Sequence, residues 1–257
     1  MSEIEYINLT LKVWRQPGPQ ERGRFETIPA ADVDPNMSFL EMLDALNEKL
    51  ILEDKEPIEF DNDCREGICG TCGAMVNGIP HGHGRGMTIC QLHMRAFNDG
   101  DTIVVEPFRA RAFKMVKDLI VDRSALDKII QAGGYISVNT GGTQDANAIP
   151  IAQETVEEAM DAAACIGCGA CVASCPSASA MLFVSAKVSQ FALLPQGKPE
   201  ANHRVLAMLK EMDNCGFSNC TNHRMCESAC PKEVCITHIA RFNREFLKAA
   251  LFNKSLL

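Results

Sequence analysis

Thirteen cysteines in a chain of 257 residues constrain this protein more than any other feature of its sequence. The first residues alternate and carry charges, without the apolar stretch of a signal peptide. No run of about 18 apolar residues is present, so we expect no segment that spans a bilayer. Thiols in a reducing compartment do not form disulfides. An odd number of cysteines, which cannot all be paired, also argues against a disulfide framework. The cysteines are therefore predicted to be metal ligands.

The overall composition is that of an ordinary globular protein. Hydrophobic residues make up 46% and charged residues 23%, which supplies enough apolar material for a core. The net charge of −8 gives no general attraction for nucleic acid or anionic lipid. We therefore expect no nucleic-acid partner, and the acidity is interpreted as a solubility feature.

The cysteines form two groups, four before residue 91 and nine from Cys165 to Cys235. A stretch rich in glycine, asparagine and threonine, residues 133–143, lies between them and predicts a loop. The fold class is therefore predicted to be α+β, with two units of different architecture. We place a first domain at residues 1–110, a connecting helix and loop at 111–147, and a mostly helical domain at 148–257.

Local patterns in the first unit predict a β-grasp domain like that of plant-type ferredoxins. Residues 7–14 alternate like a half-buried strand, and residues 103–105 resemble a closing strand. Ser38 and Glu41 form a capping box before a helical apolar face. Asn77-Gly78 favours a type I′ hairpin turn, because both residues tolerate positive φ angles.

The second unit shows no clear strand pattern and is predicted to be mostly helical. Helices are expected over residues 124–134, 179–194, 202–212 and 236–251, with the cysteine runs as turns between them. This is the pattern of a two-cluster ferredoxin with long connecting helices.

The cysteines of the first unit have the spacing of a plant-type [2Fe–2S] site. Three of them form C-x4-C-x2-C, and a distant fourth completes the set: Cys64, Cys69, Cys72 and Cys90. Glycines at 67, 70 and 73 let the backbone approach the cluster sulfides and donate amide hydrogen bonds to them. The alternative is a zinc site, although zinc ribbons and fingers use paired C-x2-C knuckles.

Two bacterial-ferredoxin runs occur in the second unit. Residues 165–176 form C-x2-C-x2-C-x3-C-P, and residues 220–231 form the same run with His223 in place of the middle cysteine. The fourth cysteine of such a run ligates the other cluster. The spacing therefore predicts a [4Fe–4S] cluster on Cys165, Cys168, Cys171 and Cys230, and a [3Fe–4S] cluster on Cys175, Cys220 and Cys226. The alternative is that His223 ligates a fourth iron.

The remaining cysteines and histidines have no ligand spacing. Cys215 and Cys235 are interpreted as structural, because free cysteines are often buried as small hydrophobes. The other histidines, His81, His83, His93, His203 and His238, are expected in solvated positions rather than metal sites. No catalytic triad, Walker loop or dinucleotide fingerprint is found, and we assign no catalytic residue.

Residues 64–72, 165–176 and 220–231 together resemble the iron–sulfur subunit of succinate dehydrogenase and fumarate reductase, the respiratory complex II family. The resemblance covers essentially the whole chain. It implies that electrons enter from a flavoprotein subunit with FAD, which also holds the dicarboxylate site. They would leave toward a membrane-anchor cytochrome b and quinone. The resemblance also implies a peripheral subunit, held by its partners on the cytoplasmic face of the cell membrane and serving the respiratory chain and the tricarboxylic acid cycle.

Departures from the mitochondrial-like members concern the loop geometry and the quinone pocket. The stretch from Cys72 to Cys90 is longer than in most members. Ala180 and Thr221 stand where those members have a pocket tryptophan and histidine, and only Pro176 matches. The chain is therefore more similar to the subclass whose anchor is a single diheme cytochrome b, with haem b as the electron acceptor.

The sequence leaves three hypotheses open. The first is the electron-transfer subunit of a succinate:quinone oxidoreductase, or the same wire run in reverse in a quinol:fumarate reductase. The second is a ferredoxin-like adaptor for another flavoenzyme. The third is a zinc-stabilised interaction module, which would be colourless because Zn²⁺ is d¹⁰.

Overall fold

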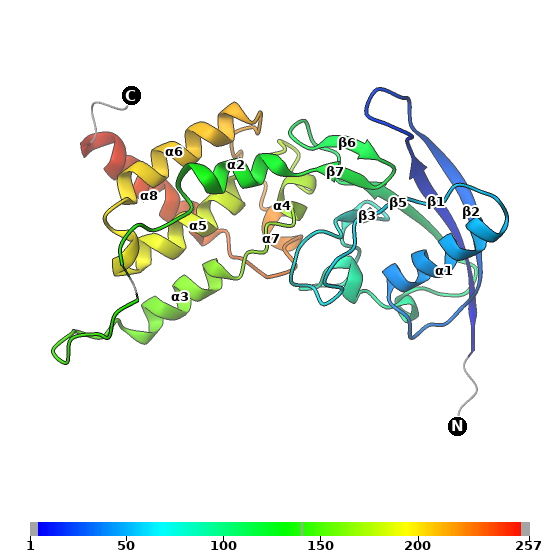
Figure 1. Ribbon diagram of the computed structural model, residues 1–257, viewed down its shortest axis with the longest axis horizontal. Helices are drawn as coiled ribbons and strands as arrows, with labels where there is room; N and C mark the ends of the chain where they lie inside the picture. Colours follow the sequence, from blue (N-terminus) through cyan, green and yellow to red (C-terminus); the bar gives the residue numbers. More distant parts are fainter. Residues whose placement is uncertain (1–4, 140, 253–257) are drawn as a thin grey trace.

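The computed structural model describes residues 5–139 and 141–252, which form two parts placed side by side along the long axis (Figure 1). The first part is built on a five-stranded sheet with strand order β2-β1-β5-β3-β4. Only the β1–β5 pair is parallel. Its strands are β1 (Ile7–Arg15), β2 (Arg24–Val33), β3 (Ala74–Val76), β4 (Ile79–Pro80) and β5 (Thr102–Pro107).

Apolar alternation in the strands and one helical face explain the core of this first part. Leu11 and Val13 of β1 are fully buried, as are Ile103 and Val105 of β5, while the residues between them are not. Helix α1 (Phe39–Leu52) covers the sheet with an apolar face at helical spacing. The β-grasp expectation is confirmed in these elements.

The predicted local signals of the first part are also present. Ser38 Oγ accepts a hydrogen bond from the Glu41 amide at 3.3 Å, and the Glu41 carboxylate accepts from the Ser38 amide at 2.6 Å. Asn77 and Gly78 both have positive φ angles, 50° and 78°, in the β3–β4 turn. The capping box and the hairpin turn were therefore predicted correctly.

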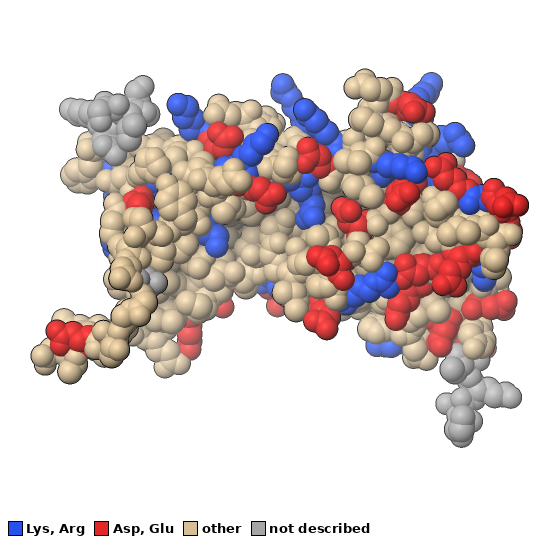
Figure 2. Space-filling view, in the orientation of Figure 1, with Lys and Arg blue, Asp and Glu red and all other residues tan. Residues whose placement is uncertain are grey.

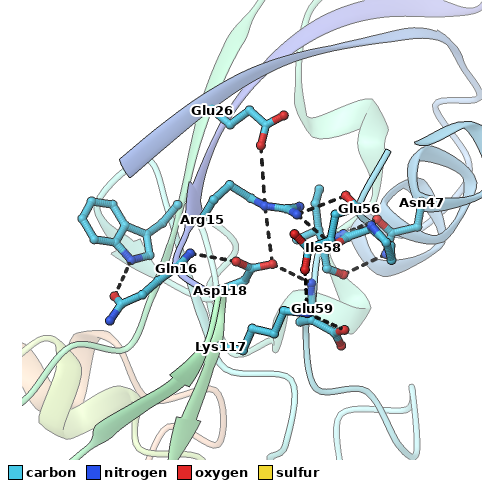
Figure 3. Close-up of polar contacts among 11 residues, drawn as sticks. Arg15, Gln16, Glu26, Asn47, Glu56, Ile58, Glu59, Lys117 and Asp118 are labelled. Carbon is cyan, nitrogen blue, oxygen red and sulfur yellow. Dashed lines mark hydrogen bonds and ion pairs between the residues drawn. The ribbon is translucent and has the colours of Figure 1, made fainter. Parts of the chain in front are cut away.

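A second, two-stranded hairpin lies in the segment predicted as a connecting helix and loop. It consists of β6 (Lys114–Lys117) and β7 (Ile120–Asp122). Asp118 in its turn is 2% exposed and accepts hydrogen bonds from the Gln16 amide at 2.8 Å and the Glu59 amide at 3.1 Å. Arg15 Nε lies 3.5 Å from the same carboxylate. This polar network ties the hairpin to β1 (Figure 3).

Helices make up the second part, and no residue that the structure describes beyond Asp122 is in a strand. The four predicted helices are confirmed within a few residues, whereas α3 and the two four-residue helices were not predicted. The helices are α2 (Ser124–Gly133), α3 (Gln153–Ala163), α4 (Ala170–Ala173), α5 (Met181–Leu193), α6 (Ala201–Asn214), α7 (Met225–Ser228) and α8 (Thr237–Phe252).

Helix α5 is the centre of this part, in contact with α3, α6 and α8. Arg204 on α6 is 1% exposed, and its guanidinium donates to the carbonyls of Gly133, Tyr135 and Gly197. It also lies 4.6 Å from the Phe191 ring centroid. A buried charge that satisfies several carbonyls in this way fixes the end of α2 against α5 and α6.

Two buried hydrophobic clusters correspond to the two parts of the chain, one around the sheet and α1, the other around α5.

In the described ranges, no helix is both long enough and apolar enough to cross a membrane. In the face shown in Figure 2, acidic side chains gather over the first part, around α1.

Candidate metal centres

The first candidate centre is a loop between α1 and β3, closed by a 3-10 turn. The loop carries Cys64, Cys69 and Cys72, and Cys90 lies in the turn Ile89–Gln91. Cys64 Sγ accepts amide hydrogen bonds from Glu66 and Ile68 at 3.4 Å and from Cys69 at 3.3 Å. These amides lower the pKa of Cys64 to about 7, which favours the thiolate that iron requires.

Burial has the opposite effect on Cys72, an inner cysteine of this centre. Cys72 and Cys90 are each 6% exposed. Burial, and next the nearby Cys90 sulfur, raise the pKa of Cys72 to about 12. Thr88 Oγ1 lies 3.0 Å from Cys90 Sγ. A buried sulfur that resists ionisation when alone, as Cys72 does, is suited to a cationic iron centre, which would stabilise its thiolate form.

The second candidate centre is a hollow between α4, α5 and the segment after α7. It is lined by Cys165, Cys168, Cys171 and Cys230, together with apolar side chains such as Leu182 and Phe183. Burial raises the pKa of Cys168 to about 12 and, together with the neighbouring sulfurs, holds that of Cys171 well above its usual range. The structure therefore brings together the four cysteines that the swapped-ligand spacing selects.

The third candidate centre lies beside α7, at the starts of α5 and α8. A smaller hollow there is lined by Cys175, Cys220 and Cys226, and His223 contributes to the same lining. The hydroxyls of Ser177 and Thr221 lie 2.7 Å apart and join the two ferredoxin runs. Burial, then the sulfurs of Cys175 and Cys220, raise the pKa of Cys226. The predicted three-cysteine set is thus also assembled.

The second and third centres have a shape that suits clusters of several atoms. Across residues 5–139 and 141–252, no three histidine, cysteine or acidic side chains are close enough to share one metal ion. The sulfurs in the second part instead border hollows. Thiolates spread around a hollow and supported by backbone amides are the donor set that iron–sulfur clusters use.

Two of the histidines are not in the solvated positions predicted from the sequence. His81 is 1% exposed, and its Nδ1 accepts a 3.4 Å hydrogen bond from the Ile89 amide. Burial lowers the pKa of His81 to about 4, so the ring is neutral at pH 7. His238 is also 1% exposed, and burial lowers its pKa. His83 and His203 are exposed as expected, and His93 is half-buried.

The two remaining cysteines border neither hollow. Cys215 donates to the Ala125 carbonyl at 3.7 Å, and Cys235 Sγ accepts from the Thr237 amide at 3.5 Å. Arg123, which no sequence motif marks as a site residue, contacts the ligand loops of two centres. A basic residue at the junction of two cysteine domains carries no spacing motif, so the sequence offered no signal for it.

Comparison with known proteins agrees with this arrangement of centres. Residues 10–128 match the family described as "2Fe-2S iron-sulfur cluster binding domain", and residues 158–231 match "4Fe-4S dicluster domain". The succinate dehydrogenase iron-sulfur subunit of Bacillus subtilis is 30% identical over 75% of this chain and 74% of its own length. The chain belongs to the iron–sulfur subunits of succinate dehydrogenase and fumarate reductase. The predicted family, the [2Fe–2S] domain and the 4Fe–4S-type domain are confirmed.

Other proteins similar to this chain differ in name and length. The fumarate reductase iron-sulfur subunit of Wolinella succinogenes is 28% identical over 72% of this chain and 76% of its own. A fumarate reductase (CoM/CoB) chain of Methanothermobacter marburgensis is 28% identical, but the match covers only 41% of that longer protein. The Mycobacterium smegmatis Sdh1 complex in the apo form contains a chain of the same fold, with a TM-score of 0.63, 18% identity, and 98% and 99% of the two chains covered.

Proposed function

We propose that this chain carries electrons in a succinate:quinone oxidoreductase, from an FAD-containing flavoprotein subunit toward a membrane-anchor cytochrome b and quinone. The observation that carries the proposal is the assembly of three separate sets of cysteines in one chain of this family. When bound, iron–sulfur clusters supply sites that accept and release single electrons. The two electrons of a dicarboxylate oxidation would therefore pass one at a time.

The cysteines have distinct positions along such a wire. Cys64, Cys69, Cys72 and Cys90 would hold a [2Fe–2S] cluster nearest the flavoprotein. Cys165, Cys168, Cys171 and Cys230 would hold a [4Fe–4S] cluster in the middle, inside the core of the second part. Cys175, Cys220 and Cys226 would hold a [3Fe–4S] cluster, since the position of the missing cysteine is taken by His223.

The partners and location follow from the family rather than from contacts of this chain. Relatives are named as subunits of succinate dehydrogenase and fumarate reductase, so a flavoprotein and a membrane anchor are the expected partners. A diheme anchor fits the presence of Ala180 and Thr221 at the positions that other members use for a quinone pocket. The subunit would then lie on the cytoplasmic face of the membrane, held by these partners.

Low-temperature EPR of the purified protein tests the cluster set and its ligands. We expect an oxidised three-iron signal, replaced on stepwise reduction by [2Fe–2S] and [4Fe–4S] signals. Cys230→Ser should lose the [4Fe–4S] signal first, whereas Cys175→Ser should lose the three-iron signal first, because the fourth cysteines are exchanged between runs. The reverse order would show that the two sets are interchanged. Absence of the oxidised signal at full iron content would instead assign His223 as a ligand.

Reversed electron flow, as in a quinol:fumarate reductase, is the second candidate, and the relatives that carry that name favour it. The complex purified with its flavoprotein distinguishes the two directions. Faster dye reduction by succinate than dye oxidation by fumarate at matched driving force supports the first. An adaptor for another flavoenzyme, the remaining alternative, predicts that neither dicarboxylate reacts in the complex.

A further inference from the structure

The loops that carry the first and second candidate centres touch each other at a glycine. A Cβ atom placed on Gly70 would lie 2.6 Å from the Ile166 carbonyl oxygen and 3.1 Å from Cys168 Cα. Gly70 also has a φ of 72°, so a side chain would be strained there even without its neighbours. Gly70 follows Cys69 directly, and Cys168 is a predicted ligand of the next centre. The backbones of the two centres therefore meet beside a cysteine of each.

Arg123 fastens the two loops at this contact. Its Nη1 donates to the Gly70 carbonyl on the first loop, and to the carbonyls of Gly167 at 3.4 Å and Cys168 at 3.3 Å on the second. A single charged nitrogen thus bridges two loops whose backbones are far apart in the sequence. Arg123 comes from the junction between β7 and α2, which belongs to neither loop.

Side-chain packing around this contact is incomplete, so the hydrogen bonds of Arg123 hold the two loops together. A cavity on one flank of the contact is lined by Cys69, Arg123, Cys165 and Lys187, so the loops are not sealed by side chains on that side. The stem of Arg123 rests near Gly169, where a built Cβ would lie 3.8 Å from Arg123 Cδ. Hydrogen bonds from a charged donor are stronger than neutral ones and hold geometry where packing is incomplete.

We propose that Arg123 is a positioning residue that holds the [2Fe–2S] loop against the [4Fe–4S] loop, and that electrons cross between the two centres at the Gly70–Cys168 contact. This inference rests on the proposed electron-transfer function. With clusters bound at both centres, one electron would leave the first, which would be oxidised, and enter the second, which would be reduced, with no bond made or broken. The permanent charge of Arg123 stabilises the added electron on either centre, so both reduction potentials are higher with it than without it.

Arg123→Met removes the charge and the hydrogen bonds together. Arg123→Lys keeps the charge but loses the planar guanidinium that donates to several carbonyls. In the full complex, we expect Arg123→Met to weaken the magnetic interaction between the two reduced centres in EPR and to lower both midpoint potentials. Arg123→Lys should keep the potentials near those of the wild type while still weakening the interaction. Arg111→Gln removes an exposed arginine of the same segment and should change neither readout.

Gly70→Ala gives an independent test of the contact itself. Its Cβ would push the two loops apart, so freeze-quenched samples should show delayed reduction of the second centre after the first. Gly78→Ala is the matched control, because Gly78 also has a positive φ, 78°, but no atom within 4 Å of a built Cβ.

The outcomes separate this inference from the proposed function. If the wild-type chain binds no clusters, the proposed function fails. If the clusters assemble, but Arg123→Met leaves both the interaction and the potentials at wild-type values, the role of Arg123 is wrong. If Gly70→Ala assembles its clusters and transfers electrons as fast as Gly78→Ala, the crossing point is wrong.

Discussion

At the scale of single residues, His81 is an imidazole that the fold of the first part keeps uncharged. Its ring is buried against Phe108, with centroids 5.3 Å apart, and Nε2 has no hydrogen-bond partner among the described residues. Burial, and then the positive charge of Arg123, lower the pKa of His81 to about 4. The native chain therefore holds this imidazole neutral, while the unfolded chain protonates it near pH 6.5.

This difference predicts a pH dependence of stability. Between pH 6.5 and about 4 the unfolded state binds more protons than the native state, so the free energy of unfolding rises with pH in that window. The stability linked to the neutral imidazole is fully present above pH 6.5 and is lost as the pH falls toward 4. Between pH 7.5 and 5.5 the loss from this group is about 1.4 kcal/mol, since one pH unit corresponds to about 1.36 kcal/mol.

Denaturant titrations at the two pH values, with the clusters intact, measure this effect. His81→Leu should reduce the loss of stability between pH 7.5 and 5.5 by about that 1.4 kcal/mol. His83→Asn, which removes an exposed imidazole from the same loop, should keep the wild-type pH dependence. An identical pH dependence in His81→Leu and the wild type would show that His81 is not the group responsible.

At the scale of secondary-structure elements, the signals that lie within a few residues of each other were the ones that could be predicted. The capping box of α1, the Asn77-Gly78 turn and the apolar alternation of β1 and β5 each depend on local sequence. Helix α3 was missed because only two small side chains, Ala159 and Ala162, are buried on it, so its apolar periodicity is weak.

The β6–β7 hairpin was missed for a different reason. Its strands have four and three residues, and it is held by Asp118, whose partners lie 102 and 59 positions away. Contacts between residues far apart in the sequence limit the prediction of the metal centres in the same way. Cysteine spacing selected the three sets, because ferredoxin runs are local motifs, but the approach of Gly70 to Cys168 depends on how the two parts pack. The burial of His81 and His238 likewise depends on tertiary packing.

The Asp118 network predicts that the hairpin is a large contributor to the stability of the first part. Asp118→Asn keeps the size of the side chain and tolerates its φ of 45°, but leaves buried Arg15 without its buried counter-charge. We expect a loss of about 3 kcal/mol, the scale for breaking a buried ion pair by removing one charge. Denaturant titration followed by Trp14 fluorescence measures it.

A matched control uses an ion pair on the surface. Glu53→Ala removes the partner of Lys55, and both side chains are more than half exposed, so stability should barely change. A loss in Asp118→Asn no larger than that in Glu53→Ala would show that the network in Figure 3 does not hold the hairpin in place.

At the scale of the whole molecule, the two parts depend on iron to different degrees. The first part has a five-stranded sheet and α1 around an apolar core in which only two of the predicted ligands, Cys72 and Cys90, take part. In the second part, Cys171 and Cys226 lie on α4 and α7, which have four residues each. Helices this short are unstable alone, so their conformation depends on what their cysteines bind.

After iron removal, the second part should therefore unfold at lower denaturant than the first. The only tryptophan, Trp14, packs on the core of the first part, so its fluorescence reports that part, whereas most helical residues lie in the second. In the full chain stripped of iron by a chelator under reducing conditions, the far-UV helical signal should be lost at lower denaturant than the Trp14 signal. Trp14→Phe identifies the fluorescence source. Coincident transitions in the iron-free chain would show that the two parts unfold as one unit, held together by the contact at Gly70 and Arg123 even without their clusters.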